Sequence, residues 1–76
     1  MPSHRSRAVA KRFGATLKYE RQNRGLSQGD LARLAGIDQT AISRLESGIR
    51  EPRLVTICSL ANALEVTPAE LISDLG

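Results

Sequence analysis

Residues 25–48 have the sequence GLSQGDLARLAGIDQTAISRLESG, in which three glycines enclose two short segments. Each segment carries apolar residues at helical spacing: Leu31, Leu34 and Ala35 in the first, and Ala41, Ile42 and Leu45 in the second. Ser27 with Asp30 approximates a capping box, and Asp38 is a favourable N-cap for the second segment. The left-handed conformation that ends many helices suits all three glycines, Gly25, Gly36 and Gly48. We expect two helices that are too short to be stable without the rest of the chain.

The flanking sequence predicts three further helices. The first runs from about Ala8 to Asn23 and turns inward Val9 or Ala10, Phe13, Leu17 and then Arg21. The second runs from about Arg53 to Leu64 and turns inward Leu54, Ile57, Leu60, Ala61 and Leu64. The last begins at a capping box formed by Thr67 and Glu70, with Pro68 in its first turn, and continues through Ile72. The predicted fold class is all-α: a compact five-helix bundle over residues 9–76, preceded by a basic, flexible arm at residues 1–8.

The connection between the two central helices is very short. It consists of Gly36, Ile37 and Asp38, and so short a turn forces the helices to cross steeply. Ala32 supplies the small residue that a close crossing needs. The whole spacing is typical of a helix-turn-helix, and it is carried by Gln28, Leu31, Ala32, Gly36, Ile37, Ile42 and Leu45. The alternative is a helical bundle with no such role.

The composition excludes several classes of function. The chain has 76 residues with one cysteine, Cys58, and one histidine, His4. This leaves no internal disulfide, no metal cluster and no catalytic constellation, so we expect neither an enzyme nor a bound cofactor or metal. No apolar run approaches the ~18 residues of a membrane span, so we expect a cytoplasmic protein with no membrane partner.

The charge is unevenly distributed along the chain. Residues 1–24 hold seven basic residues against one acidic residue, a net charge of +6, whereas from residue 25 onward four arginines face seven acidic residues, a net charge of −3. A basic end beside an acidic remainder indicates contact with a polyanion on one side of the protein. A merely solubilising basic tail is the alternative.

The stretch GLSQGDLARLAGIDQTAISRLESGIREPRLVTICSLANALEVTPAELI resembles the Cro/C1-type helix-turn-helix family of phage repressors and small bacterial regulators. The resemblance extends from about Phe13 to Ile72. It implies a five-helix DNA-binding domain, usually dimeric, that recognises operators near promoters. Two positions depart from the family pattern: Arg53 replaces a common Ser cap, and Glu20 replaces an apolar residue.

In such a domain the third helix enters the major groove, which is ~12 Å wide. With Ile42 and Leu45 facing the core, the residues expected to contact bases are Gln39, Thr40, Ser43 and Arg44. Gln39 suits adenine, Arg44 suits guanine, and the Thr40 methyl suits thymine. An ordinary solvated polar face is the alternative.

Phosphate contacts are expected on both sides of this helix. Ser27 and Gln28 lie at the start of a helix, where free backbone N–H groups attract anions, and the resemblance implies that Gln28 holds the DNA backbone. Arg50 and Arg53 follow the third helix and are expected to contact phosphate on the other flank. Arg5 and Arg7 either follow the adjacent minor groove as an arm or are disordered.

Two charged residues occupy inward-facing positions. Arg21 extends the line of Phe13 and Leu17, and Glu46 lies one turn after Ile42. We expect a buried ion pair between Arg21 and Glu46, which the resemblance also implies; exposure of both side chains is the alternative.

A dimer interface is expected on the helix over residues 53–64. Val55, Cys58 and Asn62 lie one above another on a face separate from the core, with Ile72 or Leu75 nearby. Because exposed Val and Cys are unfavourable in a monomer, we expect this face to form a two-fold interface, although scattered apolar residues are common on protein surfaces.

Together these features predict a sequence-specific DNA-binding transcriptional regulator. We expect a repressor or autoregulator that binds a palindromic operator in double-stranded DNA as a homodimer. Restriction–modification controller proteins and antitoxins share this small layout. The alternative is an antitoxin or other interaction module whose main partner is a protein.

Overall fold

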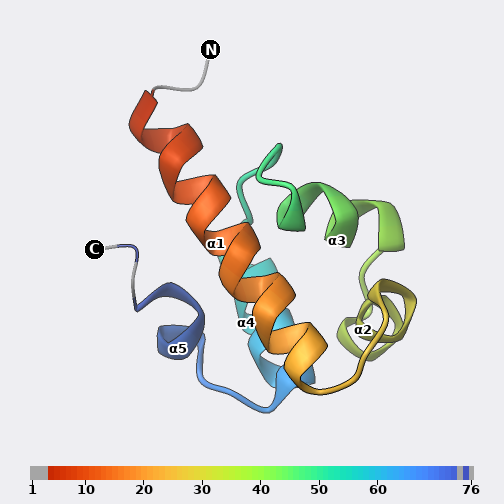
Figure 1. Cartoon of the computed structure of the whole chain (residues 1–76). Helices are drawn as coiled ribbons and strands as arrows, with labels where there is room; N and C mark the ends of the chain where they lie inside the picture. Colours follow the sequence, from red (N-terminus) through yellow and green to blue (C-terminus); the bar gives the residue numbers. More distant parts are fainter. Residues whose placement is uncertain (1–3, 74, 76) are drawn as a thin grey trace.

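The computed structural model describes residues 4–73 and 75, and these residues form five helices (Figure 1). In chain order they are α1 (His4–Asn23), α2 (Gln28–Ala35), α3 (Gln39–Glu46), α4 (Leu54–Leu64) and α5 (Pro68–Ile72). Within the described residues there is no strand, and no helix is both long and apolar enough to cross a bilayer. The predicted all-α fold with a central helix-turn-helix is confirmed.

The first helix is longer than predicted. It begins at His4 rather than near Ala8, so residues 4–8 of the expected arm continue α1 as helix. The remaining residues of the expected arm, 1–3, lie outside the described part of the chain. The physical reason is that residues 4–13 contain no glycine or proline and are rich in Arg, Lys and Ala, which favour helix.

Helices α1 to α4 all end in the same way. In each, a residue in the left-handed conformation is followed by an N–H that bonds back to a carbonyl five residues earlier, at 2.9–3.2 Å. The four left-handed residues are Gly25, Gly36, Gly48 and Glu65, with φ of 67°, 68°, 77° and 60°. The three glycine stops agree with the prediction. Glu65 was not foreseen, because a side chain in this conformation costs about 1–2 kcal/mol and sequence patterns assign it to glycine.

The helix starts agree in part with the predicted caps. Capping boxes are present at Ser27 with Asp30 and at Thr67 with Glu70. Asp38 and Arg53 occupy the N-cap positions of α3 and α4, but neither side chain caps its helix. For Arg53 this agrees with its departure from the family pattern.

A single apolar core joins all five helices. Its buried members are Phe13, Leu17, Leu31, Ala32, Ile42, Leu45, Leu60, Ala61, Leu64 and Leu71. Two predicted core residues are instead exposed: Leu34 at 60% and Leu54 at 77%. Leu34 lies on the side of α2 away from Ala32, and Leu54 is the first residue of α4, one turn before the half-buried Ile57.

Gly14 sets the distance between α1 and α3. A Cβ atom at this position would collide with the carbonyl oxygen of Leu45 and lie 2.7 Å from that of Glu46. Because both are backbone atoms, they have little freedom to move away. The absence of a side chain at Gly14 therefore allows the two helices to touch.

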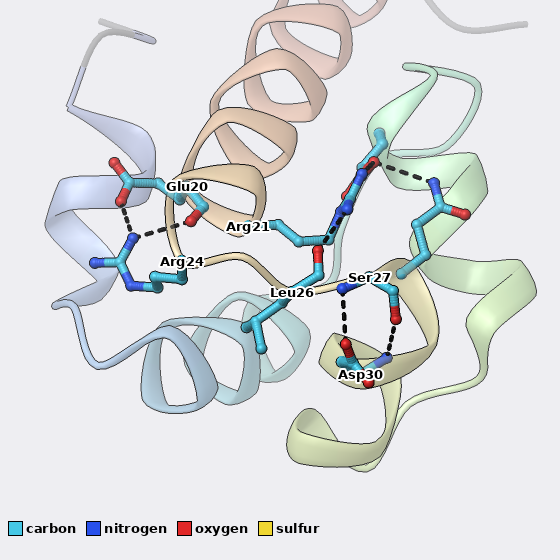
Figure 2. A network of polar contacts seen from close by, with 8 residues as sticks. Glu20, Arg21, Arg24, Leu26, Ser27 and Asp30 are labelled. Atoms are coloured by element: carbon cyan, nitrogen blue, oxygen red, sulfur yellow. Dashed lines mark hydrogen bonds and ion pairs between the residues drawn. The ribbon is translucent and has the colours of Figure 1, made fainter.

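The predicted ion pair between Arg21 and Glu46 is present next to this contact. Arg21 Nε and Nη2 donate to the two carboxylate oxygens of Glu46 at 2.6 and 3.0 Å, and Nη1 donates to the carbonyl of Leu26 at 2.8 Å (Figure 2). The side chains are only 10% and 3% exposed. The hydrogen bond to Glu46 raises the pKa of Arg21 above its ordinary value. Both charges are thus compensated in a buried position.

We expect Gly14→Ala to lower the free energy of unfolding by about 1–3 kcal/mol, because the added methyl group overpacks the α1–α3 contact. Urea denaturation followed by circular dichroism measures this change. Without the collision, replacing Gly by Ala inside a helix stabilises by about 1 kcal/mol. A gain in stability would therefore contradict the close approach of the two helices.

We expect Glu46→Ala to cost about 3–5 kcal/mol, because it leaves the Arg21 guanidinium buried without its partner. The matched control is Glu20→Ala, which breaks the more exposed pair between Glu20 and Arg24 and is expected to cost less than about 1 kcal/mol. Urea midpoints of the two variants give the comparison. Equal losses of unfolding free energy from Glu46→Ala and Glu20→Ala would mean that burial does not strengthen the pair between Arg21 and Glu46.

Candidate nucleic-acid interface

The turn between α2 and α3 is held by backbone hydrogen bonds. Gly36 adopts the left-handed conformation, and the N–H of Ile37 donates to the carbonyl of Ala32 at 2.9 Å. Ala32 itself is buried, so its small side chain allows the close crossing. In Figure 1, α3 lies at a steep angle to α2 rather than alongside it. This is the helix-turn-helix geometry that the short connection predicts.

The start of α2 is fixed by its capping box (Figure 2). The N–H of Ser27 donates to Asp30 Oδ2, and the N–H of Asp30 donates to Ser27 Oγ, both at 2.9 Å. The backbone N–H of Ser27, followed by its hydroxyl and Arg33, holds the pKa of Asp30 below its ordinary value. The hydroxyl of Ser27 is thus already engaged within the helix cap.

The outer face of α3 carries all four residues predicted to contact bases. Ile42 and Leu45 are buried, whereas the exposed residues of the helix include Gln39, Thr40, Ser43 and Arg44. Within the described residues the Arg44 side chain has no ion-pair partner. The structure therefore presents two amide- or guanidinium-bearing side chains and two hydroxyls to solvent from one short helix.

Gly29 on α2 limits the position of Gln39. A Cβ atom on Gly29 would lie 3.3 Å from Gln39 Oε1, so the amide group of Gln39 rests against the bare Cα of Gly29. The sequence does not point to Gly29, because its effect depends on how α2 and α3 cross. Gln39, the first exposed residue of α3, is therefore positioned in part by α2.

The residues predicted to contact phosphate lie in two places. Gln28, in the first turn of α2, is half-buried, and its Nε2 donates to Glu46 Oε1 at 3.1 Å. Arg50 and Arg53 are exposed in the segment between α3 and α4. Gln28 therefore shares the Glu46 carboxylate with Arg21, a contact that the sequence did not reveal.

An exposed apolar patch covers one face of α4. Val55 is 65% exposed, and Cys58 and Asn62 are also exposed. Leu54, the predicted core residue that proved exposed, adds to this patch. Ile72 of α5 is 39% exposed, whereas Leu75 is half-buried against the core. Among the described residues, no group of acidic residues, His and Cys is arranged to hold a metal ion.

Comparison with known proteins places this arrangement in a family. The helix-turn-helix family model (HTH_3) matches residues 17–71. The chain is 35% identical over 65 residues to y4dJ of Sinorhizobium fredii, an uncharacterised HTH-type transcriptional regulator, with 86% of this chain and 84% of that protein covered. It is 37% identical over 65 residues to the control protein C.MunI of a Mycoplasma species, covering 84% of this chain and 88% of that protein.

A solved structure has the same fold. The restriction–modification controller protein C.AhdI from Aeromonas hydrophila is 42% identical, with a TM-score of 0.82 over 84% of this chain and 97% of that one. The family match covers the whole of α2 and α3 and the Arg21–Glu46 ion pair, and its members are regulators without enzymatic activity. The predicted Cro/C1-type resemblance is confirmed: the chain belongs to the helix-turn-helix family of DNA-binding transcriptional regulators.

Proposed function

We propose that the protein binds a palindromic operator as a homodimer, with α3 of each subunit in the major groove. One observation carries this proposal: Gln39, Thr40, Ser43 and Arg44 are exposed together on a helix whose other side is anchored in the core. A major groove ~12 Å wide admits one such helix. The Gln39 amide can donate to N7 and accept from N6 of adenine, and the Arg44 guanidinium can donate twice, to O6 and N7 of guanine.

Phosphate groups on each side of the groove would hold α3 in register. At the start of α2, the backbone N–H groups near Ser27 and Gln28 supply donors for one strand. One N–H of the Gln28 amide is taken by Glu46, which leaves the other N–H for a phosphate oxygen. Arg50 and Arg53 supply positive charge for the opposite strand.

The exposed face of α4 is the proposed dimer interface. Leu54, Val55 and Cys58 place apolar side chains in solvent next to Asn62, and Ile72 lies on the neighbouring helix α5. A two-fold axis through this face would give two copies of α3 about one DNA turn, ~34 Å, apart. Each half-site would then contribute its own base contacts.

The relatives suggest a biological role. C.MunI is named a control protein and C.AhdI a restriction–modification controller protein, and both match most of this chain. We infer a similar controller role, exerted as a repressor or autoregulator at an operator. Binding to an operator in DNA also implies a cytoplasmic location.

The direct test selects bound sequences from a pool of random duplexes and then measures the protected length. We expect two inverted half-sites with centres about one helical turn apart. Selection of a single unrepeated site would contradict the dimer, and the absence of any enriched sequence would contradict the operator.

Base and phosphate contacts respond differently to substitution. We expect Arg44→Ala and Gln39→Ala each to cost about 1–3 kcal/mol on the selected operator and to relax preference at one base position. Arg50→Ala and Arg53→Ala are expected to weaken all sequences alike and to lower the salt slope by about one each. Binding titrations at several salt concentrations measure both quantities. The assignment is wrong if the Arg50 and Arg53 variants lose base preference as much as the Arg44 and Gln39 variants do.

The dimer interface is tested by Val55→Asp. The new carboxylate would be buried without a partner, so we expect a monomer with sharply reduced operator affinity and unchanged helical content. Sedimentation and circular dichroism measure the two properties. Lys18→Asp, on the exposed surface of α1, is the control for a changed charge and is expected to leave the dimer intact. Wild-type protein that is monomeric without DNA, together with normal operator binding by Val55→Asp, would contradict the interface.

A further inference from the structure

A groove separates the first turns of α1 from the segment that follows α3. Its volume is about 340 Å³, and Arg7 and Ala10 line one side while Ile49, Arg50 and Glu51 line the other. Both arginine side chains are exposed. The groove thus brings one of the proposed phosphate-binding residues, Arg50, beside a second cation from the opposite end of the sequence.

The two walls of the groove meet at Gly48. Gly48 has a φ of 77°, and a Cβ atom there would lie 3.0 Å from the Cα of Lys11 and 2.8 Å from its Cγ. The backbone leaving α3 therefore rests directly on α1 at Lys11. Because Lys11 is one helical turn after Arg7, the two cations share the same flank of α1.

Among the residues that the structure describes, the positive charges around this groove have no ion-pair partner. None of Arg7, Lys11 and Arg50 forms an ion pair in the described part of the chain, and the groove contains one acidic residue, Glu51. The first turn of α1 holds no acidic residue either, although the helix dipole there favours negative charge. The site is therefore complementary to an anion.

We propose that this groove binds the sugar-phosphate backbone of DNA beyond the bases that α3 contacts. The proposal rests on the proposed operator binding, because Arg50 links the groove to the α3 surface. The α1 wall is additional to the family pattern, since the family match begins at residue 17. About 10 Å of helix between His4 and Lys11 corresponds to the axial length of roughly three phosphates on one strand.

The helical conformation assigns this role to Arg7 and not to Arg5. Two residues apart, their side chains point about 200° from each other around α1. An extended arm would instead place both near the same groove of DNA. Arg5 is therefore a matched control. It has the same charge as Arg7, is also exposed and lies at the same end of α1, but on the opposite face.

The experiment compares wild-type protein with Arg7→Gln and Arg5→Gln on two duplexes. One carries the selected operator with about ten flanking base pairs on each side, and the other is trimmed to the operator itself. On the long duplex we expect Arg7→Gln to bind about three- to tenfold more weakly at ~0.1 M salt and to lower the salt slope by about one. Arg5→Gln is expected to change affinity by less than about twofold. On the trimmed duplex Arg7→Gln is expected to match wild type.

Equal losses for Arg7→Gln and Arg5→Gln would overturn the groove, because they would report only the total charge of the helix end. Unchanged binding by Arg7→Gln on the long duplex would overturn it as well. Arg44→Ala on the trimmed duplex separates this failure from that of the proposed function. If Arg44→Ala weakens binding to the trimmed duplex while Arg7→Gln leaves binding to the long duplex unchanged, operator recognition stands and only the proposed role of the groove is wrong.

Discussion

The carboxylate of Glu46 connects the first three helices, α1, α2 and α3. Glu46 is the last residue of α3, and it accepts hydrogen bonds from Arg21 of α1 and Gln28 of α2. Its side chain is 3% exposed, so the charge is stable there only because Arg21 neutralises it. Gly14 lies two turns before Arg21 on the same side of α1 and allows the backbone of α3 to approach. The orientation of α3 therefore depends on one ion pair and one missing side chain.

This arrangement explains how two helices of eight residues each are held in a fixed helix-turn-helix. Neither α2 nor α3 is long enough to be stable in isolation. Leu31, Ile42 and Leu45 bury one side of each helix in the common core, and Glu46 fixes the end of α3. The opposite side of α3 is exposed and takes no part in core packing, so its residues are available for the proposed contacts with DNA.

Local features of the fold were predictable from sequence, and features that depend on neighbours were not. The glycine stops and the Ser27 and Thr67 capping boxes involve residues at most a few positions apart, so their spacing is visible in the chain. Burial of Leu34 or Leu54 depends on whether another helix covers that position. The helical spacing of apolar residues does not contain this information.

The same distinction holds for the candidate site. The exposed set on α3 follows from the burial of Ile42 and Leu45, and Arg21 is recognisable in the sequence as a charge on an apolar line. The hydrogen bond from Gln28 to Glu46 and the close approach at Gly14 join residues 18 or more positions apart. They depend on crossing angles that no local pattern encodes.

The contact between Gly29 and Gln39 has a consequence for how this protein can acquire a new operator. Gly29 limits the room of the Gln39 amide, so a methyl group at position 29 would displace the amide by a few tenths of an ångström without any change in α3. If α3 contacts bases as proposed, preference at one base pair can therefore change through a substitution in α2 while the exposed residues of α3 stay the same. Two close homologues with identical α3 sequences would, on this basis, respond to different promoters.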